Sequence, residues 1–475
     1  VVSGSGKTTI TGNTTNNSGI NQGVSVNSGV TLTNNAALGS ENGAITNSGT
    51  ITSNAGNIKG TVTNNNTLNL SGGTLSKAVS GSGTTNITGA VTSNSAISQA
   101  INIIAAGDLT ISAGNIGGAV TNAGDLILTG GTLSKVVSGA GLTTISGNTT
   151  NNGGINQAVK VNSGVTLANN AALGSANGAI TNAGTINSNA DYIKGTVANS
   201  GSLNLSGGTL SKAVSGSGTT NITGNTTNNA GINQGVNINN GVTLTNNAAL
   251  GSDSGKITNA GTINTNASNI KGTVTNNNAL NLSGGTLSKA VSGNGTTTIS
   301  GNTTNNAGIN QGVNVNSGVT LTNNAALGSD NGKITNAGTI NTNANNIKGA
   351  VTNNNALNLS GGTLSKAVSG SGTTTISANA TNNGGISQNV NVSSGVTLTN
   401  NAALGSDSGT ITNAGTITSD ASNIKGSVTN NNTLNLSGGT LSKVVSGSGT
   451  TNITGDVTSN SAISQAISIT STGGL

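Results

Sequence analysis

The segment V-S-G-x-G-x-T-x-I occurs seven times in this chain, at a nearly constant interval. It begins at Val2, Val79, Val137, Val214, Val291, Val368 and Val445. Successive valines are separated by the same interval, except that the step from Val79 to Val137 is shorter. A long fixed period is typical of repeat architectures, in which each repeat packs mainly on its neighbours. We therefore expect a stack of similar units and no ordinary globular domain.

Each 77-residue super-repeat divides into shorter sub-repeats, whose lengths run from 17 to 22. In the first super-repeat they cover residues 2–23, 24–43, 44–60 and 61–78. The shortened super-repeat contains only three such pieces, so it has lost one whole sub-repeat and kept the others. This loss indicates that the sub-repeat is the structural unit. The super-repeats span residues 2–78, 79–136 (shortened), 137–213, 214–290, 291–367, 368–444 and 445–475 (partial).

The sub-repeats are rich in β-branched residues, Asn and Gly, and their polar and apolar residues alternate, as in Thr-Leu-Thr at 31–33. Alternation with period two predicts short strands with one buried face. Asn-x-Gly and Gly-Gly sequences between them predict tight turns. Asn66 occupies the position that Gly49 occupies one sub-repeat earlier. Because Gly and Asn both tolerate a left-handed backbone, we interpret this shared position as left-handed.

These patterns predict an all-β fold, a parallel β-solenoid in which one sub-repeat forms one coil. Four coils per full super-repeat give about 24 stacked coils, spaced like paired strands. The prediction is one continuous solenoid over residues 1–475, without domain boundaries. Its interior is a column of aliphatic side chains, because Tyr192 is the only aromatic residue. In the first super-repeat this core comprises Val24, Val26, Val30, Leu32, Leu38, Ile45, Ile51, Ile58, Val62, Leu68 and Leu75.

The composition argues against catalysis and against bound cofactors or metals. The chain has no Cys, His or Arg, and its nine acidic residues are scattered. Serine and threonine are abundant, but no histidine is present to activate a hydroxyl nucleophile. The sequence Gly4-Ser-Gly-Lys7 resembles part of a phosphate-binding loop, but the first glycine of that motif is replaced by Val1. We predict that the chain is not an enzyme and holds no cofactor or metal ion.

Charge and hydropathy limit the partners of the chain. The net charge is +6, but the lysines are thinly spread and no aromatic residues accompany them, so nucleic-acid binding is not expected. No apolar run is long enough for a transmembrane helix, and no signal peptide opens the sequence. Both ends lie within the repeat pattern, and we expect the chain to be a segment of a longer protein.

Most lysines occupy two fixed places in the super-repeat, represented by Lys59 and Lys77, which lie one sub-repeat apart. One coil separates them, so they should lie one above the other. We weigh a solvated corner that resists aggregation against a cationic ridge that contacts anionic polysaccharide or lipopolysaccharide. Acidic residues at one further corner, such as Asp253 and Asp330, precede Lys256 and Lys333 by three residues and should form surface ion pairs with them.

Two further polar patterns recur from coil to coil. Asn27, Asn47 and Asn64 should align at one corner and bond through their amides, as in stacked cross-β structures. Threonines flanking an inward aliphatic residue should form two outward files on one flat face, similar to the ice-binding face of some antifreeze solenoids. These files comprise Thr9 and Thr11, Thr31 and Thr33, Thr50 and Thr52, and Thr67 with Asn69.

The sub-repeats G-A-I-T-N-S-G-T-I (43–51) and G-T-V-T-N-N-N-T-L-N-L-S-G-G-T-L (60–75) resemble the passenger regions of bacterial autotransporter and filamentous-haemagglutinin-like adhesins. The resemblance covers nearly the whole chain. It implies a right-handed β-helix on the surface of a Gram-negative bacterium, acting in adhesion or self-association. It transfers no catalytic residues, and the secretion domains of such proteins are not visible in this sequence.

The sequence thus predicts a structural or adhesive stalk region of a secreted or surface-exposed bacterial adhesin. Its partners would be glycans, host or abiotic surfaces, or other copies of the chain. Two alternatives stay open, an ice- or crystal-surface-binding solenoid and a self-assembling extracellular matrix filament. The candidate contact residues are Lys59, Lys77, Thr31, Thr33, Thr50 and Thr52.

Overall fold

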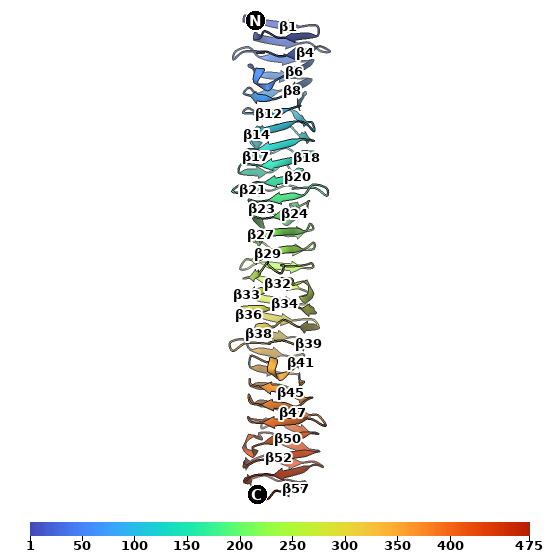
Figure 1. The fold of residues 1–475 in the computed structure, drawn as a ribbon, viewed down its shortest axis with the longest axis vertical. Coiled ribbons are helices and arrows are strands. Elements are labelled where there is room, and N and C mark those ends of the chain that lie inside the picture. Colours follow the sequence, from blue (N-terminus) through green and yellow to red (C-terminus); the bar gives the residue numbers. More distant parts are fainter. The chain divides into compact units, whose positions relative to one another are not determined.

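The computed structural model describes all 475 residues and contains two compact units, Val1–Gly235 and Val236–Leu475. In each unit short strands are stacked turn upon turn, and strands of successive turns pair in parallel (Figure 1). The only helices are six 3₁₀ turns of three residues each. The all-β parallel β-solenoid predicted from the sequence is confirmed. The predicted number of coils, about 24, is too low, because the chain makes about 28 turns of about 17 residues.

The elements of the first three super-repeats are β1 (Val2–Ile10), β2 (Thr14–Asn16), β3 (Ile20–Val26), β4 (Thr31–Asn34), β5 (Ile45–Asn47), β6 (Thr50–Ser53), η1 (Ala55–Asn57), β7 (Val62–Asn64), β8 (Thr67–Leu70), β9 (Gly73–Leu75), β10 (Val79–Ser80), β11 (Thr84–Ile87), β12 (Ala90–Ser93), β13 (Ala100–Ile103), β14 (Asp108–Ile111), η2 (Ala113–Asn115), β15 (Val120–Asn122), β16 (Asp125–Leu128), β17 (Gly131–Leu133), β18 (Val137–Ile145), β19 (Thr149–Asn151), β20 (Ile155–Val161), β21 (Thr166–Asn169), β22 (Ile180–Asn182), β23 (Thr185–Ser188), η3 (Ala190–Tyr192), β24 (Val197–Asn199), β25 (Ser202–Leu205) and β26 (Gly208–Leu210).

The remaining elements are β27 (Val214–Ile222), β28 (Thr226–Asn228), β29 (Ile232–Ile238), β30 (Thr243–Asn246), β31 (Ile257–Asn259), β32 (Thr262–Thr265), η4 (Ala267–Asn269), β33 (Val274–Asn276), β34 (Ala279–Leu282), β35 (Gly285–Leu287), β36 (Val291–Ile299), β37 (Thr303–Asn305), β38 (Ile309–Val315), β39 (Thr320–Asn323), β40 (Ile334–Asn336), β41 (Thr339–Thr342), η5 (Ala344–Asn346), β42 (Val351–Asn353), β43 (Ala356–Leu359), β44 (Gly362–Leu364), β45 (Val368–Ile376), β46 (Ala380–Asn382), β47 (Ile386–Val392), β48 (Thr397–Asn400), β49 (Thr410–Asn413), β50 (Thr416–Ser419), η6 (Ala421–Asn423), β51 (Ser427–Asn430), β52 (Thr433–Leu436), β53 (Gly439–Leu441), β54 (Val445–Ser446), β55 (Thr450–Ile453), β56 (Val457–Ser459) and β57 (Ala466–Ile469).

Each turn has three sides, and the paired residues of successive turns form one column per side. In the first unit Thr85, Val91 and Ile97 lie within one turn, and each of them belongs to a different column. The column of Ile97 contains Thr8, Val24, Ile45, Val62, Val79, Ile97 and Ile116. The column of Thr85 contains Thr14, Leu32, Ile51, Leu68, Thr85, Ile101, Val120 and Val137. The column of Val91 contains Gly73, Val91, Leu109, Leu126, Thr143, Val159, Ile180, Val197 and Val214.

The opening valines of successive super-repeats therefore lie on different sides. Val79, Val137 and Val214 belong to three different columns of the first unit. The second unit repeats this pattern, because Val291, Val368 and Val445 belong to three different columns as well. A full super-repeat thus covers about four and one-third turns, and the prediction of four whole turns is wrong. The shortened super-repeat lacks one turn but keeps the same one-third displacement.

The extra third of a turn arises in the opening segment. In the pairing of β36 with β38, Ser292 lies opposite Asn310 and Thr296 lies opposite Gly312. Three residues of β36, Gly293–Gly295, therefore face the single residue Gln311. The same register shift occurs in β1, β18 and β45. We call this segment the opening bulge. The partner strand passes this corner without a break and reaches the next side after only four residues.

The interior of each unit is mainly aliphatic, with buried Asn, Thr, Ser and Gln side chains among the apolar ones. All eleven core residues predicted for the first super-repeat are buried. Large exposed hydrophobic side chains are few and are concentrated near the chain ends, as at Val1, Val2, Ile469 and Leu475. The three-sided section is narrow, so Val, Ile and Leu fill it at native density without aromatic rings.

Glycines serve two different purposes at the corners. Gly29 has φ +75°, as expected for the turn that it forms. Gly49 does not have a positive φ, and neither does any non-glycine residue, so the prediction of a left-handed position shared with Asn66 is wrong. Gly49 is required for a steric reason, because a Cβ there would lie 2.2 Å from the carbonyl oxygen of Val30.

Candidate functional site

Charged residues gather at one corner in the first, fourth, fifth and sixth super-repeats. In the fifth super-repeat a protruding loop carries Asp330 and Lys333, Lys348 follows one turn later, and Lys366 follows one turn after that. The placement follows from the pairing of Ile334 with Val351 and of Val351 with Val368. We call these four residues the lysine corner. Because super-repeats advance by one-third of a turn, the corresponding corners within one unit lie on different sides.

The acidic residue of this corner pairs with a lysine two turns away. The Lys366 Nζ lies 2.5 Å from Asp330 Oδ1, and Lys289 and Lys443 make the same contact with Asp253 and Asp407 at 2.5 and 2.7 Å. The predicted pairs of Asp253 with Lys256 and of Asp330 with Lys333 are therefore wrong. The register explains this difference. Stacking over two turns places Lys366 at the same corner as Asp330, and Asp330 pairs with it although Lys333 is nearer in the sequence.

These ion pairs are exposed and influence the carboxylates. A hydrogen bond from the lysine lowers the pKa of Asp253, Asp330 and Asp407 below the ordinary 3.8, and the lysine charge adds to the effect. Lys425 also contributes at Asp407. Solvent screens such pairs strongly, so they add little to stability. At each of these corners, the aspartate offsets the charge of the one lysine with which it pairs.

Lys59 and Lys77 occupy the corresponding corner of the first super-repeat. Lys59 precedes Val62 and Lys77 precedes Val79, and these two valines are paired, so the lysines lie at the same corner in successive turns. Glu41 lies 3.7 Å from the Lys77 amine. Lys59 is exposed and makes no ion pair, so it is the free cation of this corner.

The outward threonines form short files. Thr31 pairs with Thr50 and Thr33 pairs with Thr52, and the side chains of all four point away from the core. Thr52 accepts a hydrogen bond of 3.1 Å from Asn69, which continues its file. The inclusion of Thr9 and Thr11 is wrong, because Thr9 pairs with Ser25 on another side.

These files change composition within a few turns. The file of Thr31 and Thr50 continues through Thr67 and Thr84 and then reaches Ala100. A neighbouring side carries outward Ile127, Thr144 and Lys160 in succession. No side of a unit therefore presents an unbroken threonine array.

Asparagine pairs run along the inner corners. The Asn47 amide donates to Asn64 Oδ1 at 2.6 Å, and both side chains are fully buried. The prediction that Asn27 belongs to this stack is wrong, because the residue paired with Asn47 in the preceding turn is Val26. A second buried series links Asn16, Asn34 and Ser53. These amides are engaged in structural hydrogen bonds and are not available to a ligand.

A buried Gln–Thr pair was missed in the sequence. In every super-repeat the glutamine amide donates to a threonine hydroxyl beneath the opening bulge, for example Gln311 to Thr297 at 2.7 Å. The sequence does carry the signal, because a threonine and a glutamine recur at fixed places after each opening valine. The other pairs are Gln22–Thr8, Gln99–Thr85, Gln157–Thr143, Gln234–Thr220, Gln388–Thr374 and Gln465–Thr451.

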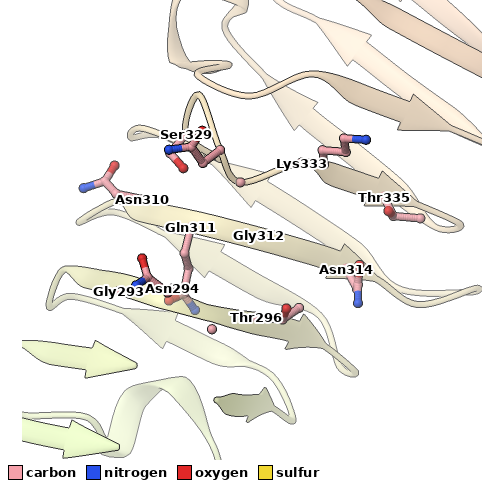
Figure 2. A pocket seen from close by; sticks show the side chains of 13 residues that line it. Gly293, Asn294, Thr296, Asn310, Gln311, Gly312, Asn314, Ser329, Lys333 and Thr335 are labelled. Atoms are coloured by element: carbon pink, nitrogen blue, oxygen red, sulfur yellow. The ribbon is translucent and has the colours of Figure 1, made fainter. Parts of the chain in front are cut away.

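A polar groove of about 700 Å³ adjoins the lysine corner of the fifth super-repeat. It is lined by the opening bulge, by Asn310–Gly312 of β38 and by the loop that ends at Lys333 (Figure 2). Asn310 and Asn314 extend outward from β38, and Lys333 extends beside Thr335 on the next turn. Smaller grooves lined by Asn, Thr and Ser lie near Asn341 and, one super-repeat earlier, near Asn264.

No three His, Cys, Asp or Glu side chains come close enough together to hold a metal ion. Lys7, the residue that suggested a phosphate loop, is an exposed residue of β1 that lies opposite Gly23. The helices are single turns, and none has the length and apolar character that crossing a membrane requires.

Comparisons with known proteins return no match. No protein-family model fits the chain, and no curated protein or solved structure matches it.

Proposed function

We propose that this chain is a structural spacer of an exported, surface-exposed bacterial adhesin. The fold supports a mechanical role, because successive turns are joined by parallel backbone pairing, and buried Asn–Asn and Gln–Thr hydrogen bonds recur along the chain. The resemblance of its sub-repeats to autotransporter and filamentous-haemagglutinin-like adhesins supports the extracellular location. The structure itself offers no concentrated chemistry that would suggest catalysis.

The observation that carries the proposal is the one-third displacement between super-repeats. Within each unit the opening bulges of three successive super-repeats lie on three different sides. A spacer that carries the same bulges on all three sides can contact a neighbouring surface in any orientation about its axis. Broad, weak contacts with glycans, surfaces or neighbouring copies are consistent with such a molecule.

Ice binding is the less favoured alternative. Ice recognition would need a flat and regular face, whereas the threonine file that includes Thr31 and Thr50 reaches Ala100 after four threonines. We expect ordinary ice growth in the presence of the chain. Thermal hysteresis that is lost when Thr31 and Thr50 are replaced by Leu would favour the alternative.

The spacer proposal predicts how length depends on repeat number. Inserting one more copy of residues 291–367 into the full chain should add about 20 Å to the maximum dimension, because four and one-third turns are spaced at about 4.8 Å. Small-angle X-ray scattering of both chains measures this increment. An increase of only a few ångströms, as expected when a globule gains the same mass, would contradict the proposal.

A further inference from the structure

Several asparagine side chains line the groove of the fifth super-repeat. Elsewhere asparagine side chains are commonly paired, even at exposed positions, as between Asn324 and Asn306. Asn294, Asn310 and Asn314 line the groove, and none of their side chains makes a hydrogen bond within the protein. Amide groups that are unpaired and gathered around one hollow are free to bind a polar ligand.

Positive charge adjoins these amides along the same corner. Lys333 lines the groove, is exposed and makes no ion pair. Lys348, one turn further, is also exposed and unpaired. Asp330 stands on the loop but is paired with Lys366, so the corner carries three cations and one anion.

The shape is that of an elongated site. From the opening bulge to Lys366 the corner passes through five successive turns, which at strand spacing span about 20 Å. The groove is polar and has no aromatic platform, which argues against flat apolar ligands. A linear molecule with hydroxyl and anionic groups at short intervals matches both the amides and the lysines.

We propose that the groove and lysine corner of residues 291–367 bind an acidic oligosaccharide. The hydroxyl groups of the sugar occupy the Asn294, Asn310 and Asn314 region, and its carboxylate or sulfate groups pair with Lys333 and Lys348. The site is additional to the spacer role, since a solenoid that binds no acidic glycan would still show the length increment described above.

The chain supplies its own matched variants. The residue at the position of Lys333 in the following super-repeat is Thr410, the first residue of β49, so Lys333→Thr creates a sequence that this fold already accommodates. Lys256 holds the corresponding place in the preceding super-repeat and is replaced at the same time. Lys160→Thr is the control, because it removes an exposed lysine near the end of β20, in another super-repeat.

The test is isothermal titration of the full chain with an oligogalacturonate, a heparin-derived oligosaccharide and a neutral maltooligosaccharide of equal length. We expect the acidic sugars to bind, more weakly at higher salt, and the neutral sugar not to bind. The double variant K256T/K333T should weaken binding by about threefold to fivefold, in the range measured for exposed charge pairs. Preference for the carboxylated or the sulfated probe would identify the anionic group.

A gain-of-function variant completes the test. The sixth super-repeat has Ser371 and Ser387 where this groove has Asn294 and Asn310. The triple variant S371N/S387N/T410K should therefore raise the number of bound oligosaccharides per chain by one, while K160T should leave both affinity and stoichiometry unchanged. Equal binding of the neutral sugar would overturn the assignment. So would an equal loss of affinity in K160T and K256T/K333T, since the attraction would then be diffuse net charge.

Discussion

At the scale of single residues, the solenoid depends on polar side chains that are buried and, with the exception of Asn122 Oδ1 and Gln157 Oε1, hydrogen-bonded. Asn336 shows this most clearly, because its amide donates to Asn353 Oδ1 and to the carbonyl oxygen of Ala356, and its own oxygen accepts from the Gly338 amide. Buried groups of this kind stabilise only while every partner is present. They also specify which turn lies next to which.

Replacing Asn336 by Ala should lower the free energy of unfolding by about 1–3 kcal/mol, because the buried hydrogen bond from its amide to Asn353 Oδ1 is lost. The control is Asn324→Ala, which removes a similar but exposed amide pair. It should change stability by less than about 0.5 kcal/mol. Guanidinium unfolding of the two variants measures both, and equal losses would show that burial of the pair is unimportant.

The exposed acids predict a small dependence of stability on acid pH. The folded-state pKa values of Asp253, Asp330 and Asp407 are lowered below 3.8, so their contribution is complete above about pH 4 and is lost as the pH falls through the folded values. The triple variant D253N/D330N/D407N should lose less of its melting temperature between pH 6 and pH 3 than the parent chain. Identical declines in both proteins would contradict this contribution of the ion pairs.

At the scale of elements, much of the architecture is predictable from the sequence. Alternation around Leu32 and Ile51 indicates strands, and the absence of aromatic residues indicates a thin core. The number of turns per super-repeat is not predictable in this way, because it depends on how many residues cross each side. The opening bulge takes three residues around a corner that its partner strand passes with Gln311 alone.

The same limit explains the errors at the candidate contact residues. Thr31 and Thr50 could be placed in one file because they are neighbours in consecutive, similar sub-repeats. Thr9 could not, because the opening bulge precedes it in its sub-repeat and places it on the side of Ser25. The pairing of Asp330 with Lys366 depends on stacking over two turns, which local sequence spacing does not reveal.

A deletion of one whole turn should be tolerated. Removing residues 313–333 places Ile334 directly at the position of Val313, its paired neighbour one turn below, so every later column keeps its register. The shortened natural super-repeat shows that the chain accommodates such a loss. We expect an unchanged β-type circular dichroism spectrum and cooperative unfolding.

The matched control is a deletion of about half a turn, residues 313–322. This change moves inward residues outward in the following turns and should reduce the β signal and the cooperativity of unfolding. If both deletions were tolerated equally, the turn could not be the structural unit.

At the scale of the whole chain, repetition distributes function. The charged corner, the polar grooves and the opening bulges recur with the super-repeat and advance by one side each time within a unit. This arrangement favours a spacer with contacts in several directions over an enzyme with a single site. The groove at Lys333 brings amides and a lysine together, and it is the site that we propose for acidic glycans.

The central claim is that the opening bulge displaces each super-repeat by one side, and cysteine pairs introduced into this cysteine-free chain test it directly. The structure places Ser292 beside Asn310 and Thr298 beside Asn314, whereas four whole coils per super-repeat would place Ser292 beside Asn314. Disulfides need Cα atoms within about 7 Å. Mild oxidation should therefore link S292C to N310C and T298C to N314C in the full chain. A link between S292C and N314C, with none between S292C and N310C, would contradict the account.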